Sequence, residues 1–369
     1  MKITAVRSYI LSTSMPKPLC LGNYVIEKVY ATIVEIMTDE GISGVGEAIA
    51  RLGPCATKSI IDDMLGPCII GSDPMEIEKL WERMFNLMRF RGHSRGYFME
   101  AISGVDIALW DVTGKVLGLP VHRLMMGCNR PEVPVYASSV FWDSPAIMAA
   151  IAADLVEKGY LPVKVKVGQG VEADYKCLEA IRQTAGTKIQ LMVDANGAYN
   201  CIDAVRLGRK LEQIDVCWFE EPIPPDDLDG YRILSKKLDI PIASGECEFS
   251  IYGMRNLIES GIQIIQPDVT RAGGITGVYK MVTLAQAFHV PYSPHIGLGS
   301  SVCMAASLHL AAAVPNFMIA EYMVVDNPLV DSLLVEPIPI PKNGMIEIPH
   351  GPGLGIEINR EALEKYRIS

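Results

Sequence analysis

Seven polar positions that could do chemistry recur through the C-terminal two-thirds of the sequence. They are Lys164 with Lys166, then Asp194, Glu220, Glu246, Asp268, His295 and Glu321, and the steps from Lys166 onward are 28, 26, 26, 22, 27 and 26 residues. Carboxylates, amines and imidazoles are the side chains that bind metal ions and transfer protons. Their types and regular spacing predict one site assembled from successive segments of the chain.

Each of these positions lies in or directly after an apolar run that predicts a buried strand. The runs are Val163–Val167, Ile189–Val193, Val216–Phe219, Ile240–Ala243, Ile262–Ile265, Val290–Pro294 and Phe317–Ala320, and Val133–Ala137 is expected to precede them as the first strand. The interval is close to the roughly 30 residues of a strand, a crossover helix and their loops. This pattern favours an α/β fold with a (β/α)8-type or (β/α)7β-type TIM barrel, whose strand ends meet at one mouth.

The first 130 residues follow a different pattern. Tyr30–Met37 and Ile42–Ala48 alternate apolar and polar residues around a break, which predicts an antiparallel hairpin, and helices are expected from Asp73-Pro74 and over Tyr97–Leu117. The tail returns to short segments rich in proline and glycine. We therefore predict an α+β capping domain of residues 1–130, completed by residues 325–369, and a barrel domain of residues 131–324.

Composition excludes several classes of protein. The chain has 369 residues, 49% of them hydrophobic, and no apolar run approaches the roughly 18 residues of a membrane span. Its net charge is −10 and no run of Lys or Arg exceeds two, which argues against nucleic acid and membrane surfaces as partners. Nine cysteines without zinc-ligand spacing indicate free thiols in a reducing cytoplasm. We expect a cytoplasmic enzyme that acts on a small molecule.

Three of the polar positions predict a metal site. Asp194, Glu220 and Glu246 end three successive predicted strands, so their carboxylates are expected to converge. Three converging carboxylates require a cation, and ligands made only of oxygen suit Mg²⁺. One such acid alone could instead cap the following helix or pair with a surface lysine, but three on consecutive strands argue against that alternative.

The remaining positions predict groups that move protons. Lys164 and Lys166 are two residues apart on a strand and point to the same side, and two such cations beside a metal push at least one amine toward its neutral form. His295 and Asp268 end neighbouring strands and are expected to form a hydrogen-bonded dyad. The other five histidines are assigned structural or surface roles. Together these groups predict proton abstraction from the carbon next to a carboxylate.

Several motifs occur in the order known from one family. They are Ala101–Asp111 with Gly118-Leu119-Pro120-Val121, Lys164-Val165-Lys166, Val193-Asp194-Ala195-Asn196, Phe219-Glu220-Glu221-Pro222, Gly245-Glu246, Gln266-Pro267-Asp268 with Gly273-Gly274, and Pro294-His295. Through these motifs the sequence resembles the enolase superfamily and, within it, the mandelate racemase subgroup. Enzymes of that superfamily use a Lys or His base with Mg²⁺ and stabilise an enediolate.

The resemblance implies a role for each motif residue. Lys166 would be one acid/base and Lys164 an electrophilic partner of the substrate carboxylate, while the His295–Asp268 dyad would be the opposite acid/base. Glu321 matches an acid on the last strand that hydrogen-bonds the substrate carboxylate. Two loops, about residues 14–26 and 48–57, resemble the family's lids, although their residues could also be solvated. The substrate-binding candidates are Asn196, Asn23, Tyr24, Arg51 and Arg89, the last four at the distal end of the substrate.

The expected function is Mg²⁺-dependent dehydration of an acid sugar to a 2-keto-3-deoxy acid by a homo-oligomer. Racemisation or epimerisation of a 2-hydroxy acid would use the same residues, and a non-catalytic barrel that binds a metal or an anion is a third alternative. Members similar to muconate cycloisomerases or dipeptide epimerases would carry a lysine around position 268. Because this chain has Asp268 and His295 instead, dehydration and racemisation are favoured over those two reactions.

Overall fold

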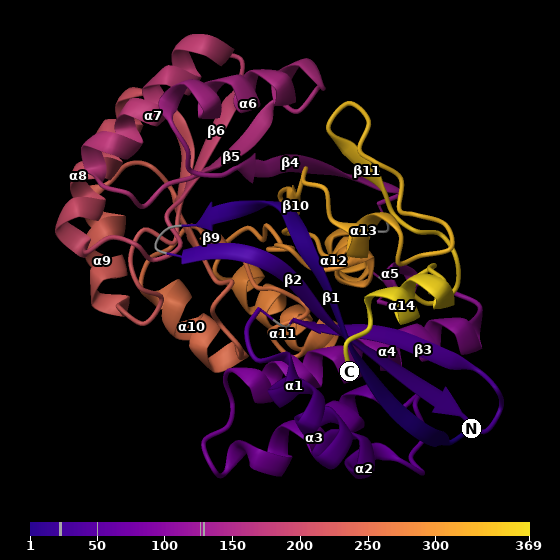
Figure 1. The fold of residues 1–369 in the computed structure, drawn as a ribbon. Helices are drawn as coiled ribbons and strands as arrows, with labels where there is room; N and C mark the ends of the chain where they lie inside the picture. Colours follow the sequence, from indigo (N-terminus) through magenta and orange to yellow (C-terminus); the bar gives the residue numbers. More distant parts are fainter. Residues whose placement is uncertain (22–23, 50, 126, 128–129) are drawn as a thin grey trace.

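The computed structural model describes residues 1–369 except 22–23, 50, 126 and 128–129. An N-terminal antiparallel sheet and its helices lie beside a larger unit in which strands and helices alternate (Figure 1). The first sheet has the order β1-β2-β3, formed by β1 (Ile3–Leu21), β2 (Tyr24–Thr38) and β3 (Ser43–Ile49). The expected hairpin of alternating residues is therefore present as β2 and β3.

The hairpin of β1 and β2 extends from the cap toward the barrel (Figure 1). Its register shifts between Ser14, paired with Lys28, and Leu19, paired with Ile26. Pro16 and Pro18 lie in the shifted segment, where they have no N–H to donate to the partner strand. Between these two prolines, Lys17 forms an ion pair of 3.0 Å with Asp143 of the barrel. The outer half of the hairpin is thus placed next to the barrel mouth.

Helices follow the first sheet in sequence, and several of them pack against its strands. They are α1 (Pro54–Ile60), the π-helical turn Ile61–Leu65, α2 (Gly66–Ile69), α3 (Ile77–Arg89), α4 (Tyr97–Leu117) and α5 (Val121–Leu124). Helix α4 packs closely on β3, since a Cβ atom added at Gly46 would lie 2.1 Å from the carbonyl oxygen of Gly104. Helix α3 begins later than predicted, because Asp73 accepts a hydrogen bond from Met75 N at 3.0 Å and forms a turn there.

The larger unit confirms the predicted parallel barrel architecture. Its strands are β4 (Glu132–Val140), β5 (Pro162–Lys166), β6 (Gln190–Asp194), β7 (Val216–Glu220), β8 (Ile242–Ser244), β9 (Ile264–Ile265) and β10 (Ala320–Tyr322). The helices between them are α6 (Pro145–Glu157), α7 (Val171–Ala185), α8 (Cys201–Gln213), α9 (Leu228–Lys237), α10 (Ile251–Glu259), α11 (Gly274–Ala287) and α12 (Ser301–Ala313). The sheet order is β10-β4-β5-β6-β7-β8-β9.

Two predicted strands differ from the structure. Val290–Pro294 is reduced to Tyr292, which makes single parallel bridges to Ile265 and Phe317 and so continues the circuit of strands toward β10. Pro291 and Pro294 cannot donate backbone hydrogen bonds, which explains why no longer ladder forms. The last strand begins at Ala320, where Phe317–Ala320 was predicted, so Glu321 lies within β10 and not after it.

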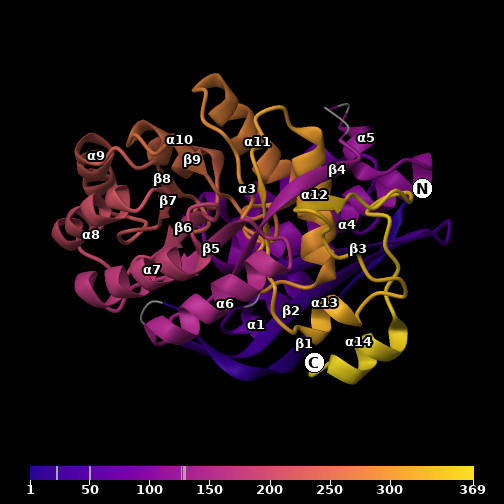
Figure 2. The same cartoon turned by 90° about the horizontal axis from the view of Figure 1, so that it is seen from above.

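The C-terminal segment touches both parts of the molecule. It contains α13 (Pro328–Asp331), β11 (Met345–Glu347) and α14 (Arg360–Tyr366). Strand β11 pairs with barrel strand β4, whereas α13 and α14 contact β1 of the cap (Figures 1 and 2). The predicted domain limits at residues 130 and 324 therefore stay a proposal.

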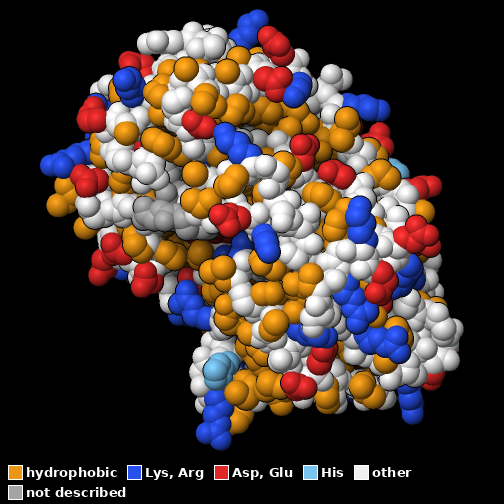
Figure 3. All heavy atoms as spheres, in the orientation of Figure 1, with side chains coloured by type: hydrophobic (Ala, Val, Ile, Leu, Met, Phe, Trp, Pro, Cys, Tyr) orange, Lys and Arg blue, Asp and Glu red, His pale blue; other side chains and the backbone are white. Residues whose placement is uncertain are grey.

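Surface and composition agree with the exclusions drawn from the sequence. Basic and acidic side chains are interspersed on the face drawn in Figure 3. The cysteines that the structure describes are free thiols. Among the described helices, none combines the length and hydrophobicity that a membrane span requires.

Candidate active site

The two lysines of β5 are buried against carboxylates at the barrel mouth. Lys164 Nζ lies 2.6 Å from Glu220 Oε1, 2.9 Å from Glu321 Oε1 and 3.6 Å from Asp194 Oδ2. Lys166 Nζ donates to Asp194 Oδ2 and, at 3.1 Å, to Asn196 Oδ1. The spacing of two residues does place both amines on the same side of the strand, as predicted.

The expectation that one amine is neutral included the charge of the metal and stays a prediction. Burial lowers the pKa of each lysine, but the facing carboxylates outweigh burial and leave both pKa values raised, that of Lys164 well above its ordinary value. The carboxylates that a cation would bind are among the groups that raise the pKa of both amines.

Asp194, Glu220 and Glu246 converge as the strand spacing predicted. Each offers a carboxylate oxygen, and these atoms lie within 4.8 Å of one another. Burial alone raises the pKa of Asp194, yet Lys166 and Lys164 outweigh it and leave that pKa lowered, whereas the pKa of Glu220 is raised mainly by burial. The group combines buried oxygen ligands with a strong need for positive charge.

One oxygen of this group supports a metal site directly. Glu246 Oε2 is buried without a hydrogen bond to any described residue, although His295 Nε2 is 3.2 Å away in poor geometry. An unpartnered buried carboxylate oxygen is costly unless a cation or water satisfies it. Asp194, Glu220 and Glu246 therefore fit a hard divalent cation.

A second acidic group shares Glu246 and fits such an ion less well. It consists of Glu221, Glu246 and Cys247. Burial raises the pKa of Glu221 well above its ordinary value, and burial likewise raises that of the Cys247 thiol. A thiol is a poor ligand for Mg²⁺, so the chemistry of the donors favours the first group.

The predicted dyad is present on the other side of the mouth. His295 Nδ1 lies 2.8 Å from Asp268 Oδ2, and Asp268 Oδ1 accepts hydrogen bonds from Thr270 N and Oγ1 at 2.7 and 2.6 Å. Burial lowers the pKa of His295, but Glu246, Glu321 and Asp268 outweigh burial and raise it. The Asp268 contact fixes the ring and directs Nε2 toward the carboxylate group.

Glu321 joins the lysine side to the histidine side. Its Oε1 pairs with Lys164, and its Oε2 accepts hydrogen bonds from the backbone N–H groups of Ile296 and Gly297 at 2.8 and 3.0 Å. Burial alone raises the pKa of Glu321, yet Lys164, His295 and Lys166 outweigh it and leave this pKa well below the usual range. In this arrangement Glu321 is an ionised carboxylate, whereas the resemblance implied a carboxylic acid.

Two adjoining cavities open at the mouth. The inner one has a volume of about 20 Å³ and is lined by Lys166, Glu246, His295 and Glu321 among others. The outer one measures about 750 Å³ and is lined by residues 25–30 of β2 and by Ile49, Arg51 and Leu52, so the predicted lids at about residues 14–26 and 48–57 reach it only in part. Asn196 and Arg51 line both cavities, as their predicted contact with a substrate requires.

The other predicted lid residues are not placed at the mouth. Arg89 is absent from the lining of both cavities: its Nη2 donates to Tyr252 OH at 3.0 Å and its guanidinium packs on the rings of Phe85 and Tyr252. The prediction for Arg89 has no support in this position, because helix α3 directs the side chain toward α10. Asn23 and the side chain of Tyr24 lie outside the described residues.

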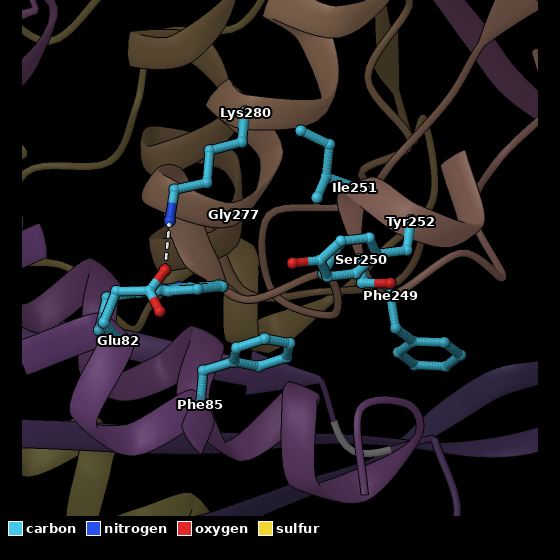
Figure 4. A pocket seen from close by; sticks show the side chains of 10 residues that line it. Glu82, Phe85, Phe249, Ser250, Ile251, Tyr252, Gly277 and Lys280 are labelled. Atoms are coloured by element: carbon cyan, nitrogen blue, oxygen red, sulfur yellow. Dashed lines mark hydrogen bonds and ion pairs between the residues drawn. The ribbon is translucent and has the colours of Figure 1, made fainter. Parts of the chain in front are cut away.

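A separate cavity lies at the contact between α3 and the segment leading into α10 (Figure 4). It measures about 110 Å³ and is lined by Trp81, Phe85 and Phe249 among others. Lys280 enters it from α11, stacks 3.7 Å from the centre of the Trp81 ring and pairs with Glu82 at 3.3 Å. Its charged groups are already paired with each other, so this cavity belongs to the packing between cap and barrel.

Sequence reasoning missed polar residues that lie next to the predicted ones. Gln266 Nε2 donates to Glu220 Oε2 at 2.7 Å, and Trp218 Nε1 donates to the same oxygen at 3.1 Å. Arg271 lines the outer cavity. Gln266 and Arg271 flank the Asp268 position in sequence, and their place beside a predicted strand end was the available signal.

Two family profiles match the chain. One is described as "Enolase C-terminal domain-like" and covers residues 147–362, and the other as "Mandelate racemase / muconate lactonizing enzyme, N-terminal domain" and covers residues 5–126. The two profiles match the barrel side and the cap side, respectively. Both matched ranges therefore agree with the fold, and the range on the barrel side contains Lys164, Asp194, Glu220, Glu246 and His295.

Individual relatives match nearly the whole chain. D-galactarolactone cycloisomerase of Agrobacterium fabrum is 36% identical and covers 100% of this chain and 99% of its own. Arabinonate dehydratase of Saccharolobus solfataricus is 33% identical over 90% of this chain and 89% of its own. The crystal structure of 3,6-anhydro-D-galactonate cycloisomerase from Zobellia galactanivorans is 35% identical with a TM-score of 0.91 over 100% of both chains. The chain belongs to the mandelate racemase and muconate lactonizing enzyme family of the enolase superfamily.

Proposed function

We propose that the protein is a Mg²⁺-dependent dehydratase of acid sugars that forms a 2-keto-3-deoxy acid. The observation that carries this proposal is the placement of two proton-transfer groups on different sides of one carboxylate group. Lys166 contacts Asp194, whereas His295 Nε2 lies 3.2 Å from Glu246. Relatives named dehydratases of arabinonate and D-xylonate, 33% and 32% identical, support an acid-sugar substrate.

Each residue has a defined part in this reaction. Asp194, Glu220 and Glu246 would hold Mg²⁺, which when bound supplies positive charge for the substrate carboxylate and for the charge that develops on it. Positive charge beside these carboxylates would weaken their hold on the Lys166 proton, so that Lys166 could act as a base. Lys164 donates to the substrate carboxylate, Lys166 exchanges the proton on the α-carbon, and His295 protonates the departing β-hydroxyl from Nε2.

Two relatives favour a second candidate, an acid-sugar isomerase. Both D-galactarolactone cycloisomerase and 3,6-anhydro-D-galactonate cycloisomerase align over the full chain. If the departing β-oxygen belongs to a ring, the same elimination opens the ring and the oxygen stays attached, so the product is an isomer. The inference from position 268 that set muconate-type cycloisomerases aside does not extend to this reaction. Racemisation would stop after proton exchange.

One experiment separates these reactions. The Mg²⁺-loaded protein is incubated in D₂O with sugar monoacids, diacids and their lactones, and NMR and mass spectrometry follow the products. A 2-keto product that has lost water supports dehydration, and a ring-opened product of unchanged formula supports the isomerase. Deuterium at C2 without elimination supports racemisation. If no acid in the library gives product or deuterium exchange, an enzymatic function for this site is contradicted.

The metal assignment has its own test. Glu220→Gln should weaken Mg²⁺ binding measured by calorimetry and abolish turnover, because it removes a charged ligand oxygen. Thermal unfolding in the absence of Mg²⁺ should show that the variant still folds. Glu179→Gln, at an exposed position on α7, is the matched control. Turnover that survives exhaustive chelation contradicts the metal requirement.

A further inference from the structure

The inner cavity cannot enclose a whole acid sugar. Its volume of about 20 Å³ is close to the space of one water molecule. It shares Arg51, Asn196, Glu246 and Leu298 with the outer cavity of about 750 Å³, so the two cavities adjoin at these residues. A substrate with its reacting carboxylate at the lysines must therefore extend past Arg51 into the outer cavity.

Arg51 is a cation that no described residue satisfies. Its side chain is partly buried and makes no hydrogen bond or ion pair within the part of the chain that the structure describes. The guanidinium packs against the segment of the dyad, since a Cβ atom added at Gly297 would lie 2.4 Å from Arg51 Nη2 and 2.7 Å from His295 Cε1. Glycine at this position, with φ of +53°, leaves the room that Arg51 occupies. An unpaired guanidinium beside the proton donor is placed to bind an anion.

Arg271 brings a second cation to the outer cavity. Its guanidinium packs 5.2 Å from the ring of Phe249, and its Nε lies 3.3 Å from Glu100 Oε1 without making a hydrogen bond. Its side chain is 20% exposed and lines the cavity, and its Nη1 donates to Cys247 Sγ at 3.8 Å. Burial raises the pKa of Glu100, and Arg271, which is in contact with it, and Arg51 oppose that rise.

The acids that line this end of the cavity leave Arg51 without an ion pair among the described residues. Glu100 offsets one of the two guanidiniums, and Glu246 belongs to the metal-binding carboxylates. Glu27 and Lys28 of β2 also line the outer cavity, but they are exposed and opposite in sign. Glu221 also lines this cavity, but none of the described acids forms an ion pair with Arg51, which is left as a cation without a counterion. A carboxylate matches a guanidinium fork in shape and in charge.

We propose that Arg51 and Arg271 form a subsite for a second carboxylate, so that the preferred substrates are polyhydroxy dicarboxylates. This inference rests on the proposed function for the position of the first carboxylate. A sugar monoacid would present a neutral hydroxyl to the two guanidiniums and leave Arg51 unpaired. The diacid is thus favoured by its distal end, away from the reacting carbons.

Binding tests this proposal without requiring turnover. Mg²⁺-loaded protein carrying Lys166→Met and His295→Asn, which cannot move the protons, is titrated calorimetrically with gluconate, glucarate, galactonate, galactarate and 6-phosphogluconate. Each diacid should bind roughly 10- to 100-fold more tightly than the monoacid of the same configuration, which is the range of one charge-assisted contact. Adding Arg51→Gln should remove most of that preference, and Arg51→Lys should restore it in part because charge returns without the fork.

The control and the contrary outcomes are specific. Arg91→Gln, an exposed position beside Phe90, should leave the preference for diacids unchanged. The proposal is overturned if monoacids and diacids bind equally, if Arg51→Gln weakens the binding of both equally, or if 6-phosphogluconate binds more tightly than glucarate. If diacids bind as expected and no acid yields product in the wild type, the subsite stands and the proposed dehydration fails. If product forms equally from monoacids and diacids, the proposed dehydration stands and the subsite fails.

Discussion

The lysine side and the histidine side of the mouth differ in what holds them in place. On the lysine side, the buried carboxylate of Asp174 accepts hydrogen bonds from the backbone N–H groups of residues 168–170, directly after Lys166, at 2.9 to 3.2 Å. It also accepts from Trp142 Nε1 at 2.7 Å and from Tyr199 OH. All of these residues belong to the barrel.

The histidine side is held by the cap. Glu47 of β3 accepts hydrogen bonds from Ser300 N, Ser300 Oγ and Cys303 N, at the start of α12 and just after His295. Asp106 of α4 accepts from Thr276 N at 2.9 Å, in the first turn of α11 and just after Asp268. Two buried cap carboxylates therefore meet the N-terminal ends of the two helices that follow the dyad, where negative charge is favourable.

Further cap contacts reach the loop between Asp268 and α11. Ile49 N donates to Thr270 O at 3.0 Å, Trp81 Nε1 donates to Gly273 O at 2.7 Å, and Ser103 Oγ accepts from Gly273 N at 2.9 Å. On the lysine side, the described residues form one ion pair with the hairpin, the exposed contact between Lys17 and Asp143, and exposed pairs contribute little. The cap thus positions half of the proton-transfer machinery and does more than cover the substrate.

The largest effect is expected when each side is removed in turn. His295→Asn should lower dehydration by at least roughly 10²- to 10⁴-fold, because no acid remains for the leaving hydroxyl. Lys166 should still exchange the α-proton of the epimer that presents it to that face. Lys166→Ala should show the opposite dependence on epimer. NMR in D₂O measures exchange for both C2 epimers, and identical loss in both variants contradicts the separation of the two sides.

A smaller effect is expected from the cap carboxylates. Glu47→Gln and Asp106→Asn should each lower the dehydration rate about tenfold, because a misplaced helix end shifts Asp268 or His295 while KM changes little. Exchange by Lys166 should stay within about twofold of wild type. Burial raises the pKa of Glu47 and of Asp106 to about 7, so the neutral amides are mild replacements.

Asp111→Asn is the control for the cap carboxylates. Asp111 is also a buried acid of α4, but it accepts hydrogen bonds from Val45 N and Leu354 N, and neither residue lies in the barrel loops of the dyad. This substitution should cost stability and leave the ratio of dehydration to exchange unchanged. If all three variants alter that ratio equally, the cap acts through overall stability and not through the dyad.

This contrast also explains which parts of the fold and of the site could be predicted from the sequence. Asp194 and Glu220 end their strands because apolar runs with a constant interval fix where each strand stops. Arg89 was misplaced because the direction of a long side chain on a cap helix depends on α10, which is distant in sequence. The raised pKa values of the lysines depend on a sum of charges from several strands. Contacts such as Glu47 with Ser300 join residues 253 positions apart, and no periodic pattern reports them.

The counterpart on the lysine side is a change in the barrel itself. Asp174→Asn should weaken the contacts of residues 168–170 and lower exchange by Lys166 roughly three- to tenfold, because an amide offers one acceptor oxygen where the carboxylate offers two. Exchange by His295 at the opposite face should be nearly unchanged. The measurement is again exchange in D₂O with both C2 epimers. An equal loss at both faces would show that the lysine side is not an independent unit.

The smallest effect on turnover is expected from a buried histidine pair between α12, α5 and the C-terminal segment. His309 Nε2 donates to Leu354 O at 3.0 Å, which leaves Nδ1 as an acceptor 3.0 Å from His122 Nδ1. Burial lowers the pKa of His309 from 6.5 to about 3, so the unfolded chain takes up a proton more readily than the folded chain. This stabilisation is complete above pH 6.5 and is lost as the pH falls toward 3.

Urea unfolding at two pH values tests that assignment. Between pH 7 and pH 5 the wild type should lose about 2 kcal/mol of unfolding free energy that His309→Gln does not lose, since an unfolded-state imidazole is almost fully protonated at pH 5. His289→Asn, at an exposed position, controls for the loss of one imidazole. The ratio of dehydration to exchange at pH 8 should not change in either variant. If His309→Gln altered that ratio, the contact between α12 and the tail would also position the dyad, and the cap-held side would extend to the end of the chain.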